Sequence, residues 1–287
     1  MAQRLTLPAR ERALLREAFG ERELVIDRLS GGVHGRCYRV RAEDIDCAVR
    51  MPAADEGEYR LDSGAEQRIL ARLAASGLSP AVVPLEPALG LVATRYLADA
   101  RAWSVGDARR TENVVRLAAR LRNLHALELD VPSYACAAAA RSYVARAAER
   151  GQLTREQRAW RDELERRAAD FETRHKGTTP CHNDLVASNV LDDGSLRLVD
   201  LEYAAASSPL LDLAGFAGLN DLDREERKLL VTAYYGEVRS PIGPDELDAA
   251  IRLVRLLAMF WALAASGSEE PGSPLAAFAD AMAAMLM

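Results

Sequence analysis

Short apolar runs that alternate with polar residues dominate the first hundred positions of the chain. Runs of this kind predict β-strands at residues 24–29, 37–41, 46–51, 81–85 and 91–97. Between the third and fourth run, apolar positions at helical spacing predict a helix over residues 64–75, which Ser76-Gly77 closes. These elements predict a small, mainly β N-terminal lobe at residues 1–98.

The pattern changes at about residue 99, where apolar positions begin to repeat at helical spacing. Helices are expected at residues 111–127, at 137–175 with one break near 151, at 245–265, and from 273 onward. The strand signals of this half, at 189–191 and 196–201, flank an Asp-Asp-Gly turn and predict a β-hairpin. Residues 99–287 are therefore predicted to form a larger, helical C-terminal lobe.

Length and charge narrow the class of protein. A chain of 287 residues is longer than a single hydrophobic core usually supports, and its composition, 49% apolar and 28% charged, is typical of a folded globular protein. The 37 basic and 43 acidic residues give a net charge of 37 − 43 = −6, which argues against a nucleic-acid partner. The N-terminus shows no secretory signal pattern, and the longest apolar run, residues 256–265, is too short to span a bilayer. We therefore expect a cytoplasmic protein without a membrane partner, and its oligomeric state stays open.

One segment carries residues that phosphoryl transfer requires. The sequence H-N-D-L-V-A-S-N, at 182–189, places Asp184 and Asn189 five positions apart at the entrance to the predicted hairpin. Protein kinases use this spacing for an Asp that accepts the substrate hydroxyl's proton and an Asn that binds magnesium. Asp200 ends the strand after the turn, where kinases place a further magnesium ligand. Asp184 is thus the candidate catalytic residue, and Asn189 and Asp200 are candidate Mg²⁺ ligands, because Mg²⁺ prefers oxygen atoms.

The N-terminal lobe contains candidates for nucleotide binding. Ser30, Gly31 and Gly32 open a turn between two predicted strands, where backbone amides could cover phosphates, although a simple hairpin turn fits the same residues. Arg50 stands on the third predicted strand where protein kinases carry a lysine, and a guanidinium can bind phosphate oxygens. Glu66, on the following helix, is its expected ion-pair partner; the alternative is a solvated charge on the helix surface.

Several motifs occur together in the order expected of one family of kinases. They are S-G-G-V-H-G from Ser30, A-V-R from Ala48, H-N-D-L-V-A-S-N from His182, V-D-L-E-Y from Val199 and D-L-A from Asp212. The chain resembles the choline/ethanolamine kinase and aminoglycoside phosphotransferase superfamily, especially its bacterial choline-kinase-like and thiamine-kinase-like proteins. The resemblance implies an α+β class, with a bilobal protein-kinase-like fold. It also implies that ATP and Mg²⁺ bind between the lobes, with the adenine against the backbone near Tyr96.

The same resemblance points to an acceptor site for a small cation. Glu202, Tyr203 and Trp261 are the candidate substrate residues, because carboxylates and aromatic faces hold an ammonium group. Trp261 equally suits core packing, since it lies on the apolar stripe of a mainly hydrophobic helix. Choline kinases of this group usually carry W-x-x-W, and here the match is Phe260-Trp261 alone.

The expected activity is transfer of the γ-phosphate of ATP to the hydroxyl of a small cationic alcohol such as choline or ethanolamine. Thiamine and aminoglycosides are alternative acceptors. A pseudokinase that binds nucleotide without chemistry is a further alternative, against which the intact Asp184, Asn189 and Asp200 argue.

Three more residues are expected to support the candidate catalytic segment. His125 lies on an apolar helix stripe and is predicted to be a buried histidine that is hydrogen-bonded to the catalytic-loop region. His182 is predicted to brace the loop. Asp212 is predicted to hold the loop through backbone amides, an arrangement that favours the ionised carboxylate.

Overall fold

The computed structural model describes residues 7–29, 36–52, 60–236, 241–266 and 273–287. The chain divides into two compact units. The N-terminal unit comprises residues 1–103 and 188–204, and the C-terminal unit comprises residues 104–187 and 205–287. The predicted hairpin therefore clusters with the β-rich part of the chain, although it follows several helices in the sequence. The lobe boundary predicted after residue 98 stays a prediction.

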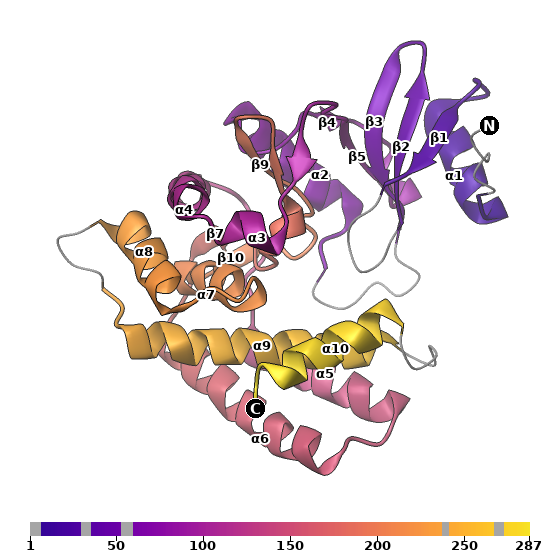
Figure 1. The fold of residues 1–287 in the computed structure, drawn as a ribbon. Coiled ribbons are helices and arrows are strands. Elements are labelled where there is room, and N and C mark those ends of the chain that lie inside the picture. Colours follow the sequence, from indigo (N-terminus) through magenta and orange to yellow (C-terminus); the bar gives the residue numbers. More distant parts are fainter. Residues whose placement is uncertain (1–6, 30–35, 53–59, 237–240, 267–272) are drawn as a thin grey trace. The chain divides into compact units, whose positions relative to one another are not determined.

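The N-terminal unit contains an antiparallel sheet with the strand order β1-β2-β3-β5-β4 (Figure 1). Its strands are β1 (Val25–Arg28), β2 (Cys37–Ala42), β3 (Ile45–Arg50), β4 (Val82–Val83) and β5 (Val92–Arg95). All five predicted strands are confirmed within a few residues at each end. Along β3, Cys47 and Val49 are buried and their neighbours are more exposed, which is the alternation that identifies a strand. Arg50 ends β3 opposite Cys37 of β2.

Helices α1 (Ala9–Phe19) and α2 (Ser63–Ala75) belong to the same unit. The predicted helix at 64–75 is confirmed as α2, which begins where the Asp62 carboxylate accepts a hydrogen bond from the Ala65 amide at 2.8 Å. The sequence pattern does not predict α1. Leu15 and Phe19 are the only apolar residues buried in α1, so its apolar stripe is too short to stand out among the charges around it.

A second sheet joins the hairpin to this unit. It has the order β6-β8-β9, from β6 (Arg101–Ala102), β8 (Val190–Asp192) and β9 (Leu196–Leu198), and it confirms the predicted hairpin. Gly194 closes the turn with φ 98°, a left-handed conformation that glycine adopts without strain. Trp103 Nε1 donates to the Asp192 carboxylate at 3.1 Å, and the Leu198 amide donates to the Leu78 carbonyl at 2.7 Å. These contacts fix the hairpin within its unit.

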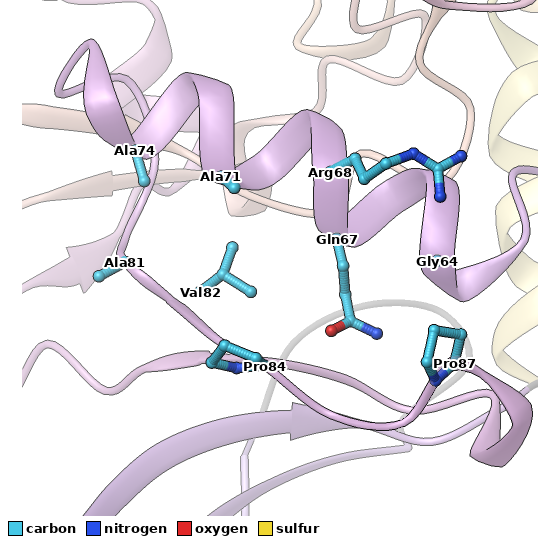
Figure 2. A pocket seen from close by; sticks show the side chains of 9 residues that line it. All are labelled: Gly64, Gln67, Arg68, Ala71, Ala74, Ala81, Val82, Pro84 and Pro87. Carbon is cyan, nitrogen blue, oxygen red and sulfur yellow. The ribbon is translucent and has the colours of Figure 1, made fainter.

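A groove of about 460 Å³ lies between α2 and the segment that follows it (Figure 2). Its lining is mostly small and apolar and comes from Gly64, Gln67, Arg68, Ala71, Ala74, Ala81, Val82, Pro84 and Pro87. The Gln67 side-chain oxygen accepts a hydrogen bond from the Leu85 amide at 3.0 Å, which holds this segment against the helix. Within the described residues, no predicted catalytic, metal, nucleotide or acceptor residue lines this groove, so it is separate from the candidate site.

The C-terminal unit is mainly helical. Its helices are α3 (Val105–Ala108), α4 (Thr111–His125), α5 (Cys136–Arg150), α6 (Arg155–Arg174), α7 (Pro209–Leu219), α8 (Arg224–Tyr235), α9 (Pro244–Ser266) and α10 (Pro274–Ala284). Strands β7 (Thr179–Cys181) and β10 (Ala205–Ser207) pair in a small sheet. Helices α5, α6, α9 and α10 lie together (Figure 1). The helices predicted in this half are confirmed, and the break near residue 151 separates α5 from α6.

The sequence pattern does not predict α7 and α8. Nine of the eleven residues of α7 are buried, so the helix lacks the polar face on which amphipathic spacing depends. A serine N-cap followed by Pro209 marks the start of α7, and a capping box of Asp223 and Glu226 marks the start of α8. With the sheet of the N-terminal unit and these helices, the predicted α+β class is confirmed.

Helix α9 is the one helix in the described part of the chain whose length and composition would suit a membrane span, with a mean hydropathy of 1.6. Half of this apolar window is buried inside the protein. Helix α9 packs against α5, α7 and α10. A core helix of this kind passes the same test, so α9 alone does not indicate a membrane protein, and the cytoplasmic location stays a prediction.

Candidate active site

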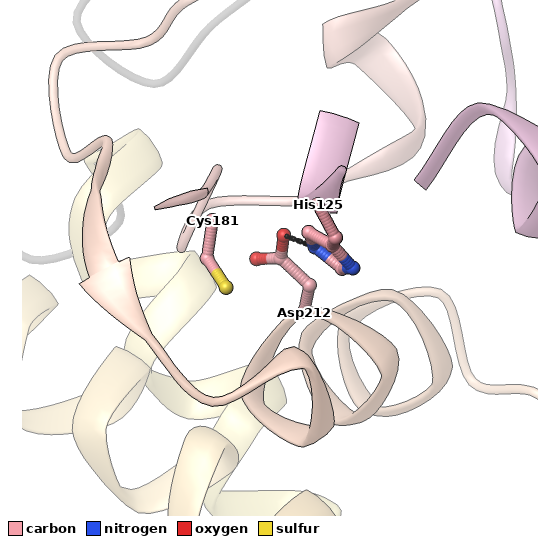
Figure 3. Close-up of side chains that lie close together, drawn as sticks. All are labelled: His125, Cys181 and Asp212. Carbon is pink, nitrogen blue, oxygen red and sulfur yellow. Dashed lines mark hydrogen bonds and ion pairs between the residues drawn. The ribbon is translucent and has the colours of Figure 1, made fainter. Parts of the chain in front are cut away.

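Asp212, on α7, holds the segment that contains Asp184. Its carboxylate is 1% exposed and accepts hydrogen bonds from the amides of His182 at 2.9 Å and Asn183 at 2.7 Å. A further hydrogen bond joins Asp212 Oδ2 to His125 Nε2 at 2.9 Å (Figure 3). Burial alone raises the pKa of this carboxyl, but the bond to His125 and the backbone amides outweigh it and lower the pKa below its ordinary value. The predicted role of Asp212 as an ionised anchor of the loop is confirmed.

His125 completes this anchor from α4. Its Nδ1 lies 2.6 Å from the hydroxyl of Tyr234, and burial raises the pKa of that tyrosine, which keeps its proton on the oxygen. The tautomer with a proton on Nε2 satisfies both contacts, because it donates to Asp212 and accepts from Tyr234. The prediction of a buried, hydrogen-bonded His125 is confirmed.

Cys181 lies beside this pair, and the ligand atoms of His125, Cys181 and Asp212 fall within 4.8 Å of one another (Figure 3). Three residues of these types could hold a metal ion by distance alone. Both oxygens of Asp212 already accept hydrogen bonds, however, and burial raises the pKa of the Cys181 thiol, which disfavours the thiolate that binds metals. The cluster is therefore better suited to bracing the loop than to binding a metal ion.

Asn220, at the end of α7, is a second anchor that the sequence pattern does not reveal. Its side-chain oxygen accepts a hydrogen bond from the Ala187 amide at 2.8 Å, and its side-chain nitrogen donates to the Leu185 carbonyl at 3.3 Å. Asn220 is 1% exposed. One buried helix thus fixes both ends of residues 182–187, with Asp212 at the first end and Asn220 at the second.

The backbone of the loop itself is unusual. Asn183 has φ 62°, a left-handed conformation that asparagine adopts more readily than most residues with a Cβ atom. The Asp184 amide donates to His182 Nδ1 at 3.3 Å, so the predicted brace by His182 is confirmed. The catalytic role of Asp184 stays a prediction at this stage.

We expect Asp212→Asn to lower the free energy of unfolding by about 2–4 kcal/mol at pH 7, because an amide cannot replace a buried carboxylate that accepts three hydrogen bonds. The folded-state pKa of Asp212 lies below its unfolded value, so its stabilisation is complete above about pH 4 and is lost as the pH falls through the folded pKa. Thermal unfolding at several pH values checks this: the difference between wild type and Asp212→Asn should shrink below about pH 4.

Asp130→Asn is the matched control for this comparison, because Asp130 is an exposed carboxylate in the same unit. It should unfold at the wild-type temperature throughout the pH series. Equal unfolding temperatures for Asp212→Asn and wild type at pH 7 would contradict the anchoring role.

The two candidate metal ligands lie in the N-terminal unit, at the open end of the hairpin. Val190 pairs with Leu198, and the Val199 amide donates to the Asn189 carbonyl at 3.0 Å, so the backbone places Asn189 beside the strand that leads to Asp200. Asp200 has φ 63°, and its buried Oδ1 accepts no hydrogen bond from any residue in the described ranges. This oxygen lies at ion-pair distance from Arg50 Nε, 3.4 Å, and a carboxylate oxygen that accepts no hydrogen bond can still bind a cation, so the residues present fit a magnesium site.

Arg50 connects Asp200 to a cluster of buried charges in the same unit. Its Nη2 donates to Glu66, its Nη1 donates to Glu202 at 2.5 Å, and its Nε lies 3.4 Å from Asp200 Oδ1. Glu202 also accepts a hydrogen bond from Arg60. The predicted pairing of Arg50 with Glu66 is confirmed, and Glu66 is 1% exposed, so it is not a solvated surface charge. Burial raises the pKa of Glu66, and Arg50 opposes this by favouring the ionised form.

The remaining predicted nucleotide residues lie apart from this cluster or outside the described ranges. Ser30, Gly31 and Gly32 lie outside the described residues. Tyr96 follows β5, and its ring lies under the guanidinium of Arg39, with the guanidinium carbon 3.9 Å from the ring centroid. Contact of the adenine with the backbone near Tyr96 stays a prediction.

The predicted acceptor residues belong to both units of the chain, Glu202 and Tyr203 to the N-terminal unit and Trp261 to the C-terminal unit. Glu202 is 4% exposed, and its carboxylate is bound by arginines. Tyr203 lies beside it, with the Arg60 guanidinium 5.8 Å from its ring centroid. Trp261 is in the C-terminal unit, where its ring meets Phe278 of α10 edge-on at 6.2 Å. Of these three residues, Glu202 is thus engaged in an ion cluster, and Trp261 takes part in core packing.

Known proteins resemble this chain in sequence and in fold. The family model described as the phosphotransferase enzyme family matches residues 25–272. The choline kinase LicA from Streptococcus pneumoniae has a TM-score of 0.78 at 17% identity, over 97% of this chain and 99% of that chain. A choline/ethanolamine kinase family protein from Mesorhizobium loti has a TM-score of 0.75 at 24% identity, over 96% and 92%. The macrolide 2′-phosphotransferase MphH from Brachybacterium faecium has a TM-score of 0.60 at 21% identity, over 97% and 98%.

No curated protein matches the chain. Two of the structurally similar enzymes have been solved with nucleotides: LicA in complex with AMP, and a spectinomycin phosphotransferase in complex with ADP and spectinomycin. The solved structures confirm the predicted kinase-like fold, with a small β-rich N-terminal lobe and a larger helical C-terminal lobe.

Proposed function

Because the chain belongs to the phosphotransferase enzyme family and is a small-molecule kinase, we propose that it transfers the γ-phosphoryl group of ATP to the hydroxyl of choline or ethanolamine. The observation that carries the proposal is the loop of residues 182–187, which α7 holds at both ends through Asp212 and Asn220. A loop fixed in this way supports a rigidly placed Asp184, and positioning supplies most of the catalysis in phosphoryl transfer.

Asp184 is the proposed catalytic residue. Its carboxylate would accept a hydrogen bond from the acceptor hydroxyl, orient that oxygen toward the γ-phosphorus, and take its proton as the new P–O bond forms. The bond to the leaving ADP oxygen breaks in the same transfer, so the products are ADP and a phosphate monoester. Proton transfer of this kind contributes about 10²–10⁴-fold to the rate.

Asn189 and Asp200 are the proposed ligands of Mg²⁺. The Oδ1 of Asp200, which accepts no hydrogen bond from the described residues, and the place of Asn189 beside the same end of the hairpin support this assignment. Bound Mg²⁺ would neutralise charge on the phosphate oxygens. Arg50, paired with Glu66, is the proposed phosphate-binding cation, and the nucleotide complexes of two structurally similar enzymes support ATP as the donor.

The structural relatives and the aromatic residues set the order of the candidate acceptors. Choline and ethanolamine take first place because the choline and choline/ethanolamine kinases give TM-scores of 0.75–0.78, against 0.60 for the macrolide phosphotransferase. Tyr203 and Trp261 are the proposed aromatic contacts of the ammonium group. Glu202 fits a supporting role better than direct acceptor binding, because two arginines already bind its carboxylate. Thiamine and aminoglycosides remain the alternative acceptors.

ADP release tests the proposed function. The protein is incubated with ATP and Mg²⁺ against choline, ethanolamine, thiamine, a panel of sugars, an aminoglycoside and a macrolide. We expect release that depends on choline or ethanolamine. Release with thiamine or an antibiotic alone would reassign the acceptor, and no acceptor-dependent release with any of them would contradict the proposal.

A further inference from the structure

We propose that Arg60 is a positioning residue of the nucleotide site, which acts on Arg50 through the carboxylate that the two arginines share. This inference rests on the proposed role of Arg50 in binding nucleotide phosphates. The sequence motifs do not single out Arg60, which lies between β3 and α2 and is 142 positions from Glu202 in the chain.

Arg60 is held in place by contacts with two consecutive residues. The guanidinium donates a hydrogen bond to Glu202 Oε2 and lies 5.8 Å from the ring centroid of Tyr203, within the distance of a cation–π contact. The amide of Leu61 donates to the carbonyl oxygen of Glu202 at 2.7 Å. Only 10% of the Arg60 side chain is exposed. Two contacts of the guanidinium and the backbone hydrogen bond of the next residue hold this largely buried side chain in one position more firmly than a surface arginine is held.

Arg50 and Arg60 compete for one oxygen atom. Glu202 Oε2 accepts a hydrogen bond from Arg50 Nη1 at 2.5 Å as well as the one from Arg60. A buried carboxylate requires a compensating positive charge. Because Arg60 supplies part of that charge, Arg50 does not compensate Glu202 alone and can also bind Glu66.

The charge of the cluster leads to the same conclusion. The two arginines and the three carboxylates of Glu66, Asp200 and Glu202 sum to 2 − 3 = −1. Loss of Arg60 would bring this to −2 and leave Arg50 as the only cation, among the residues that the structure describes, in contact with Glu202. Arg50 would then be held more tightly by its own protein, and a more negative cluster would repel the phosphates of a nucleotide.

The test is a set of steady-state measurements on Arg60→Gln. We expect the KM for ATP to rise about tenfold or more, the scale of losing one hydrogen bond between charged groups, with the KM for the acceptor nearly unchanged. Arg60→Lys should recover part of the loss because it restores the charge. Arg72→Gln is the matched control, since Arg72 is an exposed arginine on α2, and it should behave as wild type.

The double variant separates positioning from simple stabilisation. In a Glu202→Gln background there is no carboxylate for Arg60 to neutralise. The double variant should therefore have nearly the same KM for ATP as Glu202→Gln alone. An equal rise in both backgrounds would overturn the proposal, as would an unchanged KM for ATP in Arg60→Gln, whether or not its unfolding temperature falls. If Arg60→Gln alone does not fold, Arg60→Lys and the double variant give the same comparison.

Two measurements distinguish a failure of the proposed function from a failure of the Arg60 inference. Wild-type turnover with ATP tests that function in the same assay. Titration calorimetry of Mg²⁺-ADP with wild type, Arg60→Gln and Arg72→Gln tests the Arg60 inference without turnover. We expect Arg60→Gln to bind Mg²⁺-ADP about tenfold more weakly, and equal affinities for all three proteins would overturn the inference.

Discussion

Asp184→Asn is expected to lower kcat for ATP-dependent phosphorylation by about 10²–10⁴-fold, the contribution of a general base, and to leave nucleotide affinity nearly unchanged. The loop is anchored through backbone amides by Asp212 and through Ala187 by Asn220. An amide of the same shape at position 184 should therefore keep the loop in place and remove only the group that accepts the proton.

Initial rates with a saturating acceptor, together with calorimetric titration of Mg²⁺-ADP, check this expectation. Asp193→Asn is the matched control, because Asp193 is an exposed carboxylate in the hairpin turn and its hydrogen bond from the Ser195 amide can be kept by asparagine. Substantial turnover by Asp184→Asn would rule out the proposed base. Loss of nucleotide binding together with activity would instead show that Asp184 supports the fold of the site.

Asp200→Gly should have opposite effects on binding and on stability. We expect it to weaken Mg²⁺-nucleotide binding by at least about 100-fold, because loss of a direct ligand should exceed the effect of losing an outer contact of a metal site. In the absence of nucleotide, the same variant should be more stable by about 1 kcal/mol, since glycine removes the strain at φ 63°. It also removes a half-buried carboxylate that shares Arg50 with the buried carboxylates of Glu66 and Glu202.

Thermal unfolding with and without Mg²⁺-ADP measures both effects in one experiment. Asp200→Asn serves as a second variant, because asparagine tolerates the left-handed conformation and loses only the charge. Asp44→Ala is the matched control: Asp44 is exposed in the same unit and pairs only at the surface with Arg22. If Asp200→Gly is less stable without nucleotide and binds it normally, the residue is structural and the proposed metal role is wrong.

Local patterns explain why much of the fold could be predicted. The alternating burial along β3 and the glycine turn of the hairpin each depend on residues that are close together in the sequence. Both could therefore be predicted, the strand from its alternation of apolar and polar residues and the turn from its glycine. Helix α7 shows no amphipathic spacing, because a helix buried on nearly all sides has no polar face. Asp212 of this helix was nevertheless identified, because D-L-A at residues 212–214 is one of the motifs that carry the resemblance to the kinase superfamily.

The candidate site could be predicted only in part for a similar reason. Asp184, Asn189 and Asp200 follow a spacing set by one loop and one hairpin, so they can be recognised from the sequence. Arg60 and Asn220 act on residues far away in the chain, and neither belongs to a motif. The sequence also predicted Glu202 to be an acceptor residue. The two arginines that bind its carboxylate, Arg50 and Arg60, are more than a hundred positions away in the chain, so no local pattern could reveal this ion cluster.

Transfer of the γ-phosphoryl group from ATP to choline or ethanolamine can be measured directly by following that phosphate into the products. ATP with an isotopic label in that phosphate is incubated with the wild-type protein, Mg²⁺, and choline or ethanolamine, and the products are identified by mass spectrometry. We expect a labelled phosphate monoester of the acceptor in equal amount to ADP, and none with Asp184→Asn. A label that remains in ATP, or that appears only as inorganic phosphate with both alcohols, would contradict this expectation.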